Sequence, residues 1–252
     1  MPPAYLRIAA QIRERVADGT YRPDSRLPGI RQLAVEHQVS EIVIRQVMRL
    51  LVQEGLIRAV PGSGHYVRRR RPVRRIALDR YRREATHQPG DRPATSFTED
   101  RGIGWSEYRL DKRFEVEAAD ERLARLFEVE PGTPVLARHF VFYAQDEPSQ
   151  LSRSCVLQSD VEGTPVADPA NEPWPGGTPA QLASIGLSVT RVEESVRGRL
   201  PTADEASTLA MEPSMPVLAI TRRMFSGFRV VEVAADIVMP AEGVSLDYGV
   251  DL

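Results

Sequence analysis

One stretch, residues 39–51, constrains the fold of this chain more than any other. Its apolar residues recur at spacings of three and four, which predicts a helix with one buried stripe. They are Ile44, Val47, Met48 and Leu51. Ser40 stands at the N-cap position, so its hydroxyl is expected to accept from an early helical N–H. A shorter helical pattern at residues 29–36 precedes it after a tight connection, which is typical of a helix-turn-helix whose second helix enters the DNA major groove.

Segments on both sides complete a small domain. An amphipathic pattern over residues 5–16 predicts a first helix, and Gly19 follows it at a typical C-terminal position. Residues 56–60 and 65–67 flank Pro61–Gly64, which predicts a β-hairpin. A hairpin directly after the helix predicted within residues 39–51 is typical of a winged helix-turn-helix, in which the hairpin is called the wing.

The charge distribution separates the two ends of the chain. Residues 1–71 contain 13 arginines and 6 acidic residues, which gives them a net charge of +7, whereas the remainder carries −9. A basic front and an acidic rear favour a nucleic-acid-binding module joined to a domain of another role.

Residues 5–67 resemble the winged helix-turn-helix of the GntR family of bacterial transcription regulators. The matching motifs are Gly19, Leu27-Pro28, Arg31–Ala34, Val39-Ser40, Arg45, Leu51, Glu54–Leu56 and Gly62–Val67. The resemblance implies that double-stranded operator DNA is the partner. It also implies a set of DNA-contacting candidates, which are Arg31, Ser40, Glu41, Val43, Arg45, Gly62, Ser63 and His65.

The start of the helix predicted within residues 39–51 departs from the family pattern. Family members usually have Arg-x-Thr where this chain has Glu41-Ile42-Val43. Glu41 would repel phosphate and could accept from a cytosine amino group, or it could simply face solvent where a carboxylate suits a helix N-terminus. Arg31 and Arg45 could also be solvated helix residues, and His65 could only pack. The family's usual operator therefore does not transfer to this chain.

The rear of the chain shows an internal duplication. We expect a winged helix-turn-helix domain at residues 1–70, an arginine-rich linker at 71–95 and a second domain at 96–252. A helix–turn–strand pattern occurs at residues 121–142 and again at 205–225. Such a repeat predicts a pseudo-symmetric α+β domain with an antiparallel sheet.

Together with the preceding winged helix, the rear domain resembles the ligand-sensing UTRA domain of the HutC subfamily, whose architecture is similar to chorismate lyase. The resemblance implies a homodimer and an effector pocket between the halves, and the arginines of similar proteins suit an anionic ligand. The implied effector-binding residues are Arg138, Phe140, Arg153, Ser154, Thr178, Arg222 and Glu232. Arg138 and Arg222 could equally be edge-strand charges, and Trp174 could pack a loop or support a ligand. Residues 173–182 are also similar to actinomycete regulators of plasmid transfer.

Other classes fit the sequence less well. An enzyme is not expected, because Lys112 lacks a glycine-rich phosphate cradle and no nucleophile elbow occurs. No histidine pair has metal-binding spacing, and Cys155 is the only cysteine, so neither metal nor cofactor is predicted. No apolar run is long enough for a membrane span and no signal peptide is indicated, so we expect a cytoplasmic protein.

The sequence thus predicts a sequence-specific transcription regulator. We expect a dimeric repressor that a small-molecule effector releases from a palindromic operator. The alternatives are a DNA-binding protein whose rear domain only dimerises, and an enzyme fused to a DNA-binding domain.

Overall fold

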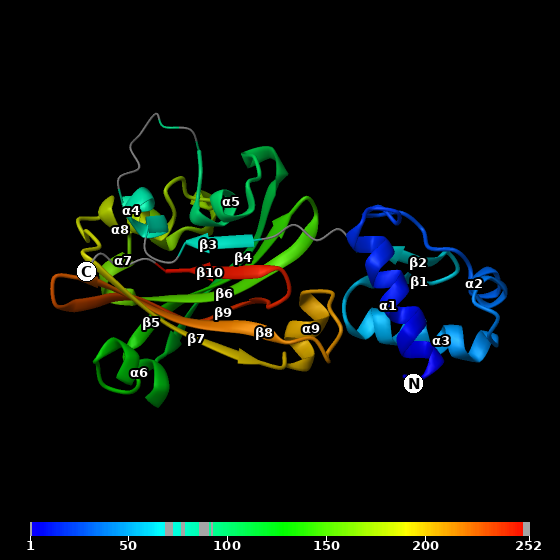
Figure 1. Ribbon diagram of the computed structural model, residues 1–252. Helices are drawn as coiled ribbons and strands as arrows, with labels where there is room; N and C mark the ends of the chain where they lie inside the picture. The colour runs from blue at the N-terminus through cyan, green and yellow to red at the C-terminus, as the bar shows by residue number, and fades with distance from the viewer. Residues whose placement is uncertain (1, 69–72, 77–78, 86–90, 92, 249–252) are drawn as a thin grey trace. The chain divides into compact units, whose positions relative to one another are not determined.

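The computed structural model describes residues 2–68, 73–76, 79–85, 91 and 93–248 (Figure 1). The chain divides into two compact units whose main boundary falls between residues 71 and 72. Within the described residues, no helix is both long and apolar enough to cross a membrane.

The first unit consists of three helices and a two-stranded antiparallel hairpin. Its elements are α1 (Ala4–Ala17), α2 (Ile30–Glu36), α3 (Glu41–Gln53), β1 (Ile57–Val60) and β2 (Gly64–Val67). The predicted helix-turn-helix and wing are therefore confirmed. Asp24 and Gln38 have positive φ values of 62° and 53° in the two connections, so each connection places a residue other than glycine in left-handed backbone.

The core of the first unit forms where the predicted stripe of α3 meets α1. Ile44, Val47 and Leu51 are fully buried, and they cluster with Ile8 and Ile12 of α1. The predicted capping bond of Ser40 is wrong, because its side chain caps no N–H. Its backbone carbonyl instead accepts from the N–H groups of residues 43 and 44 at 3.1 and 3.3 Å.

The second unit is built on a six-stranded antiparallel sheet of order β4-β5-β6-β9-β8-β7. The strands are β4 (Tyr108–Ala118), β5 (Pro134–Ala144), β6 (Glu147–Leu157), β7 (Arg191–Arg199), β8 (Val217–Ser226) and β9 (Arg229–Pro240). Each half runs from an edge strand through a helix into a hairpin, and β6 pairs with β9 where the halves meet. This arrangement confirms the pseudo-symmetric α+β domain.

Equivalent caps begin the helices of the two halves. Asp120 accepts from the N–H of Leu123 before α6 (Glu121–Phe127). Thr202 forms a capping box with Glu205 at the start of α9 (Ala203–Thr208). A side-chain oxygen thereby satisfies an early N–H at each start, which fixes where the helix begins.

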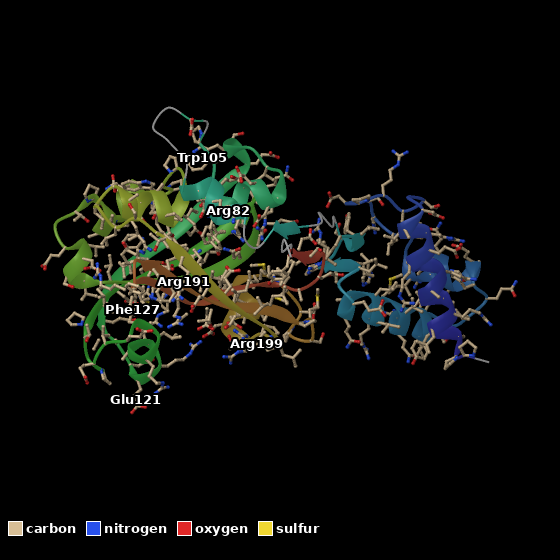
Figure 2. All side chains as sticks on the ribbon, turned by 60° about the vertical axis from the view of Figure 1, so that its left-hand side comes forward. Arg82, Trp105, Glu121, Phe127, Arg191 and Arg199 are labelled. Atoms are coloured by element: carbon tan, nitrogen blue, oxygen red, sulfur yellow. The ribbon has the colours of Figure 1, made fainter. Side chains whose placement is uncertain are left out.

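Helices cover both faces of the sheet. Figure 1 shows α6 on one face, and α4 (Asp79–Ala85), α5 (Ser96–Arg101) and α8 (Gly177–Ala183) on the other. In Figure 2, Phe127 lies on the sheet side of α6, where it is buried in the core, and Glu121 lies at the outer end of that helix. The remaining short elements are α7 (Gln158–Val161) and three 3-10 turns, η1 (Trp105–Glu107), η2 (Pro165–Ala167) and η3 (Pro169–Asn171).

The segment expected to be a linker contains regular structure. Residues Val73–Ile76 form β3, which pairs in parallel with β10 (Val244–Asp247) near the other end of the chain. The α4 helix follows, and its Arg80, Tyr81 and Glu84 are all buried. The segment predicted as a linker over 71–95 therefore contains two regular elements, one of which pairs with a strand distant in the sequence and one of which has buried residues.

The packing of α3 leads to a matched pair of substitutions. Ile44 is fully buried and Ile42, two residues earlier in the same helix, is 76% exposed. Ile44→Ala should lower the opening free energy of the α3 amides by about 2–5 kcal/mol because it leaves a cavity. Ile42→Ala should change it by less than about 0.5 kcal/mol. Hydrogen exchange of the α3 amides measures both, and equal effects would contradict the assigned core face.

Candidate functional site

The exposed start of α3 carries a three-residue ion cluster. Glu41 Oε1 accepts from Arg31 Nε at 3.2 Å, and Glu41 Oε2 accepts from Arg45 Nη2 at 3.1 Å. The Arg31 side chain is 92% exposed and that of Arg45 is 60% exposed, so both remain accessible to a partner. Sequence reasoning missed the cluster because Arg31 lies on α2, ten residues before Glu41.

Neighbouring residues divide between the surface and the core. Val43 is half-buried and packs against the core of the first unit, four residues before Val47 on the same stripe. Its prediction as a base-contacting residue is therefore not supported by its orientation. Ile42, which was not among the candidates, is exposed at the helix start, and Ser40 is exposed beside it.

The wing brings its candidates together in a tight turn. Gly62 has a φ of +72° and is exposed, and Ser63 Oγ lies 2.6 Å from the hydroxyl of Tyr66. The guanidinium of Arg58 lies over the Tyr66 ring at 5.4 Å. His65 is half-buried, and this burial lowers its pKa, which favours the neutral imidazole and agrees with the packing alternative.

The second unit contains a cleft above one face of its sheet, with about 690 Å³ of empty space including its opening to solvent. Its floor comes from β4, β5, β6, β8 and β9, and its rim comes from α4, α5 and the segment around α8. Of the predicted effector-binding residues, those lining the cleft are Phe140, Ser154, Thr178 and Arg222.

The other predicted effector-binding residues lie elsewhere. Arg138 and Glu232 are fully buried beneath the lining and have no exposed surface. Arg153 lies on the opposite face of the sheet, because side chains alternate along β6 and its neighbours Ser152 and Ser154 face the cleft. It pairs there with Glu117 of β4, so it does not line the cleft with the other predicted effector-binding residues.

A chain of polar contacts joins the two halves beneath the cleft. Arg222 on β8 donates from Nη2 to Glu232 Oε1 at 2.6 Å and from Nε to Oε2 at 3.2 Å. Ser154 on β6 donates to Glu232 Oε1 at 2.7 Å. Arg138 on β5 donates to Ser154 Oγ at 2.7 Å. Each of these four hydrogen bonds therefore joins two neighbouring strands.

The same chain continues towards the rim. Arg138 also donates to Gln181 Oε1 at 2.5 Å, and Gln181 Nε2 donates to Glu172 Oε1 at 3.0 Å. Burial lowers the pKa of the Arg138 guanidinium. Burial also opposes the charge of Arg222, yet the Glu232 carboxylate and Tyr81 together outweigh it and raise the pKa of Arg222 well above its ordinary value. A charged pair is thus stable at this depth because each partner neutralises the other.

Several cleft residues were missed by sequence reasoning. Arg80 and Glu84 come from the segment that composition marks as a linker, and Arg80 pairs with Asp100 at 3.0 Å. Tyr108 and Phe142 line the cleft on β4 and β5, and period-two alternation of aromatics along these strands could have identified them. Trp174 also lines the cleft.

Comparison with known families decides the identity of both units. The model of the bacterial regulatory proteins of the gntR family matches residues 4–67. The model of the UTRA domain matches residues 111–240, more than half of the chain. The chain belongs to the GntR family. Its second unit is a UTRA domain, and its resemblance to the HutC subfamily is confirmed.

Full-length relatives share the same organisation. A chain described as a GntR-family transcriptional regulator is 31% identical, with 99% of this chain and 98% of that chain covered at a TM-score of 0.59. An HTH-type transcriptional regulator of Streptomyces coelicolor is 29% identical over 87% of this chain and 82% of its own length. The histidine utilization repressor of Klebsiella aerogenes is 26% identical over 91% of this chain and 87% of its own length. These relatives are transcriptional regulators, so the prediction of a regulator rather than an enzyme is confirmed.

The buried pair of this GntR-family chain leads to a second matched comparison. Glu232→Gln should destabilise the UTRA domain by about 3–5 kcal/mol, because it leaves the buried Arg222 cation without a counter-ion. Glu193→Gln is the control, because Glu193 pairs with Arg223 at a half-exposed site and Arg223 lies on β8 as Arg222 does. It should lower the free energy of unfolding by at most about 1 kcal/mol. Urea unfolding followed by the signal of the UTRA domain measures both. Equal losses would show that the Arg222–Glu232 pair contributes no more than a surface pair.

Proposed function

We propose that this GntR-family regulator is a dimeric repressor that leaves a palindromic operator when a small molecule occupies the cleft of its UTRA domain. The proposal rests on the observation that one chain contains two separate structural features. One is a winged helix with accessible arginines at the start of α3, and the other is a lined cleft in the second unit. A repressor among the full-length relatives supports the direction of control.

The DNA-contacting surface is proposed to comprise the start of α3 and the wing. Arg31, Arg45 and Ser40 are exposed on the helix-turn-helix, and Gly62 is exposed at the tip of the wing. In a helix-turn-helix, the N-terminal residues of the second helix lie nearest the base edges. The guanidinium groups can bind guanine or phosphate, and the exposed Ile42 methyl groups suit contact with a thymine methyl.

Selection of bound sequences from random double-stranded DNA tests the proposal directly. The proposed dimer should enrich an inverted repeat whose half-sites lie about one helical turn, roughly 34 Å, apart. Sedimentation of the chain with the selected DNA should give two chains per site. Enrichment of a single half-site by one chain would contradict the dimeric arrangement. If the repeat is enriched but cell extract never releases it, the second domain only dimerises.

The Glu41 cluster predicts a change in the salt dependence of DNA binding. Glu41→Gln removes the carboxylate that neutralises Arg31 and Arg45, so affinity should rise for all sequences alike. The slope of log K against log salt concentration should steepen by up to about one. Glu36→Gln is the matched control, because Glu36 is also an exposed helical glutamate but pairs with Arg15. Fluorescence anisotropy against salt measures both slopes. A changed base preference without a changed slope would show instead that Glu41 accepts from a base.

A further inference from the structure

The walls of the cleft combine aromatic rings with charged groups. Five aromatic residues line it, which are Phe97, Tyr108, Phe140, Phe142 and Trp174. The Phe142 ring centroid lies 5.1 Å from that of Phe97 and 5.8 Å from that of Phe140, so these rings form one continuous surface. Aromatic faces attract both apolar groups and cations. The wall therefore does not by itself decide the charge of a ligand.

The two arginines that line the cleft are already neutralised within the domain. Arg222 holds Glu232 through two hydrogen bonds, and Glu232 is fully buried. Arg80 holds Asp100 at 3.0 Å, with both side chains less than 10% exposed. An anionic ligand would have to compete with a buried carboxylate at either guanidinium. The arginines therefore do not form a vacant anion site.

Among the described residues, the two carboxylates that line the cleft accept hydrogen bonds only from neutral groups, although Glu84 also attracts the buried cation of Arg80 and Glu172 attracts that of Arg138. Glu84 Oε1 accepts from the backbone N–H of Ser96 at 2.8 Å. Glu172 accepts from the backbone N–H of Trp174 at 2.8 Å and from the side-chain amide of Gln181 at 3.0 Å. Lys112 donates to the backbone carbonyl of Glu172 rather than to its carboxylate. Among the described side chains, none of the ion pairs involves either carboxylate.

Two further observations point to a ligand at these carboxylates. Ser96 lines the cleft and is 98% buried, yet its hydroxyl has no hydrogen-bond partner among the described residues. A Cβ at Gly177 would lie 2.7 Å from Glu84 Oε1, so the absence of a side chain there keeps space for the carboxylate at the cleft. Burial raises the pKa of the Tyr108 phenol, and the carboxylates of Glu172 and Glu84 raise it further. Two carboxylates thus lie beside the aromatic wall of the cleft.

We propose that the cleft binds an organic cation, with its ammonium group facing Glu84 and Glu172 and its apolar body against the aromatic rings. This inference rests on the proposed function, since it names the chemical class of the effector. It replaces the anionic ligand expected from resemblance. A cation gains from both carboxylate attraction and aromatic faces without breaking either buried ion pair.

Three probes of similar size and different charge test the proposal on the full chain. They are 2-phenylethylammonium, 2-phenylethanol and phenylacetate, each titrated by calorimetry and by thermal shift. The ammonium should bind at least about tenfold more tightly than the other two and should raise the melting temperature most. Tightest binding of phenylacetate, or no binding of the ammonium at millimolar concentration, would overturn the proposal.

Charge-removing variants locate the site. Glu84→Gln and Glu172→Gln keep the acceptor oxygen and the size of the side chain, so each should weaken the ammonium at least about tenfold and leave 2-phenylethanol unchanged. Glu147→Gln is the control, because Glu147 is an exposed carboxylate outside the cleft. The unchanged affinity for 2-phenylethanol reports that each variant is folded. If both variants lost affinity equally for the ammonium and for 2-phenylethanol, or if neither lost affinity for the ammonium, the result would contradict the assigned position.

The same probes separate this inference from the proposed function. If phenylacetate binds the cleft and releases DNA, the regulator functions as proposed but the ligand class is wrong. If the ammonium binds the cleft and leaves DNA affinity unchanged, the ligand class holds and effector control by this cleft fails.

Discussion

The organisation of the second domain depends on one buried ionic contact at the centre of its sheet. Arg222 and Glu232 pair beneath the cleft, and Ser154 and Arg138 extend the contact across the β6–β9 seam where the two halves meet. Other ion pairs between the halves, such as Arg122–Asp236 and Arg223–Glu128, lie at more exposed positions. Because charges at this depth are stable only when paired, the network requires both halves in register.

The same network determines which charges remain for a ligand. It uses the carboxylate of Glu232 to neutralise Arg222, so the guanidinium that resemblance assigns to an effector is already bound. The carboxylates of Glu84 and Glu172 line the same opening and form no ion pair among the described residues. In the first domain, Glu41 pairs with two outward-facing arginines and offsets one of their two positive charges. In both domains a carboxylate of the same domain therefore lowers the net positive charge of neighbouring arginines.

The sequence was sufficient for features that depend on local periodicity, and insufficient for those that depend on distant partners. The apolar stripe of α3 and the repeated helix–turn–strand pattern both predicted elements that the structure contains. The pairing of β3 with β10 joins segments near opposite ends of the second domain, and no local pattern indicates such a pairing. Arg153 and Ser154 are neighbours in one strand, so their side chains lie on opposite faces of the sheet. The sequence does not reveal which of the two faces carries the cleft, and the structure places Ser154 there. Charge neutralisation at Arg222 likewise became visible only with its partner strand in place.

The central claim is that occupancy of the cleft and binding of operator DNA are coupled. Coupling between two sites is reciprocal, so each ligand must weaken the other by the same factor. The most direct measurement is calorimetry of a cleft ligand with the chain alone and with the chain saturated by its selected operator. The account predicts weaker ligand binding on the operator complex, by the same factor by which the ligand weakens operator binding. Equal ligand affinity in both states would contradict it.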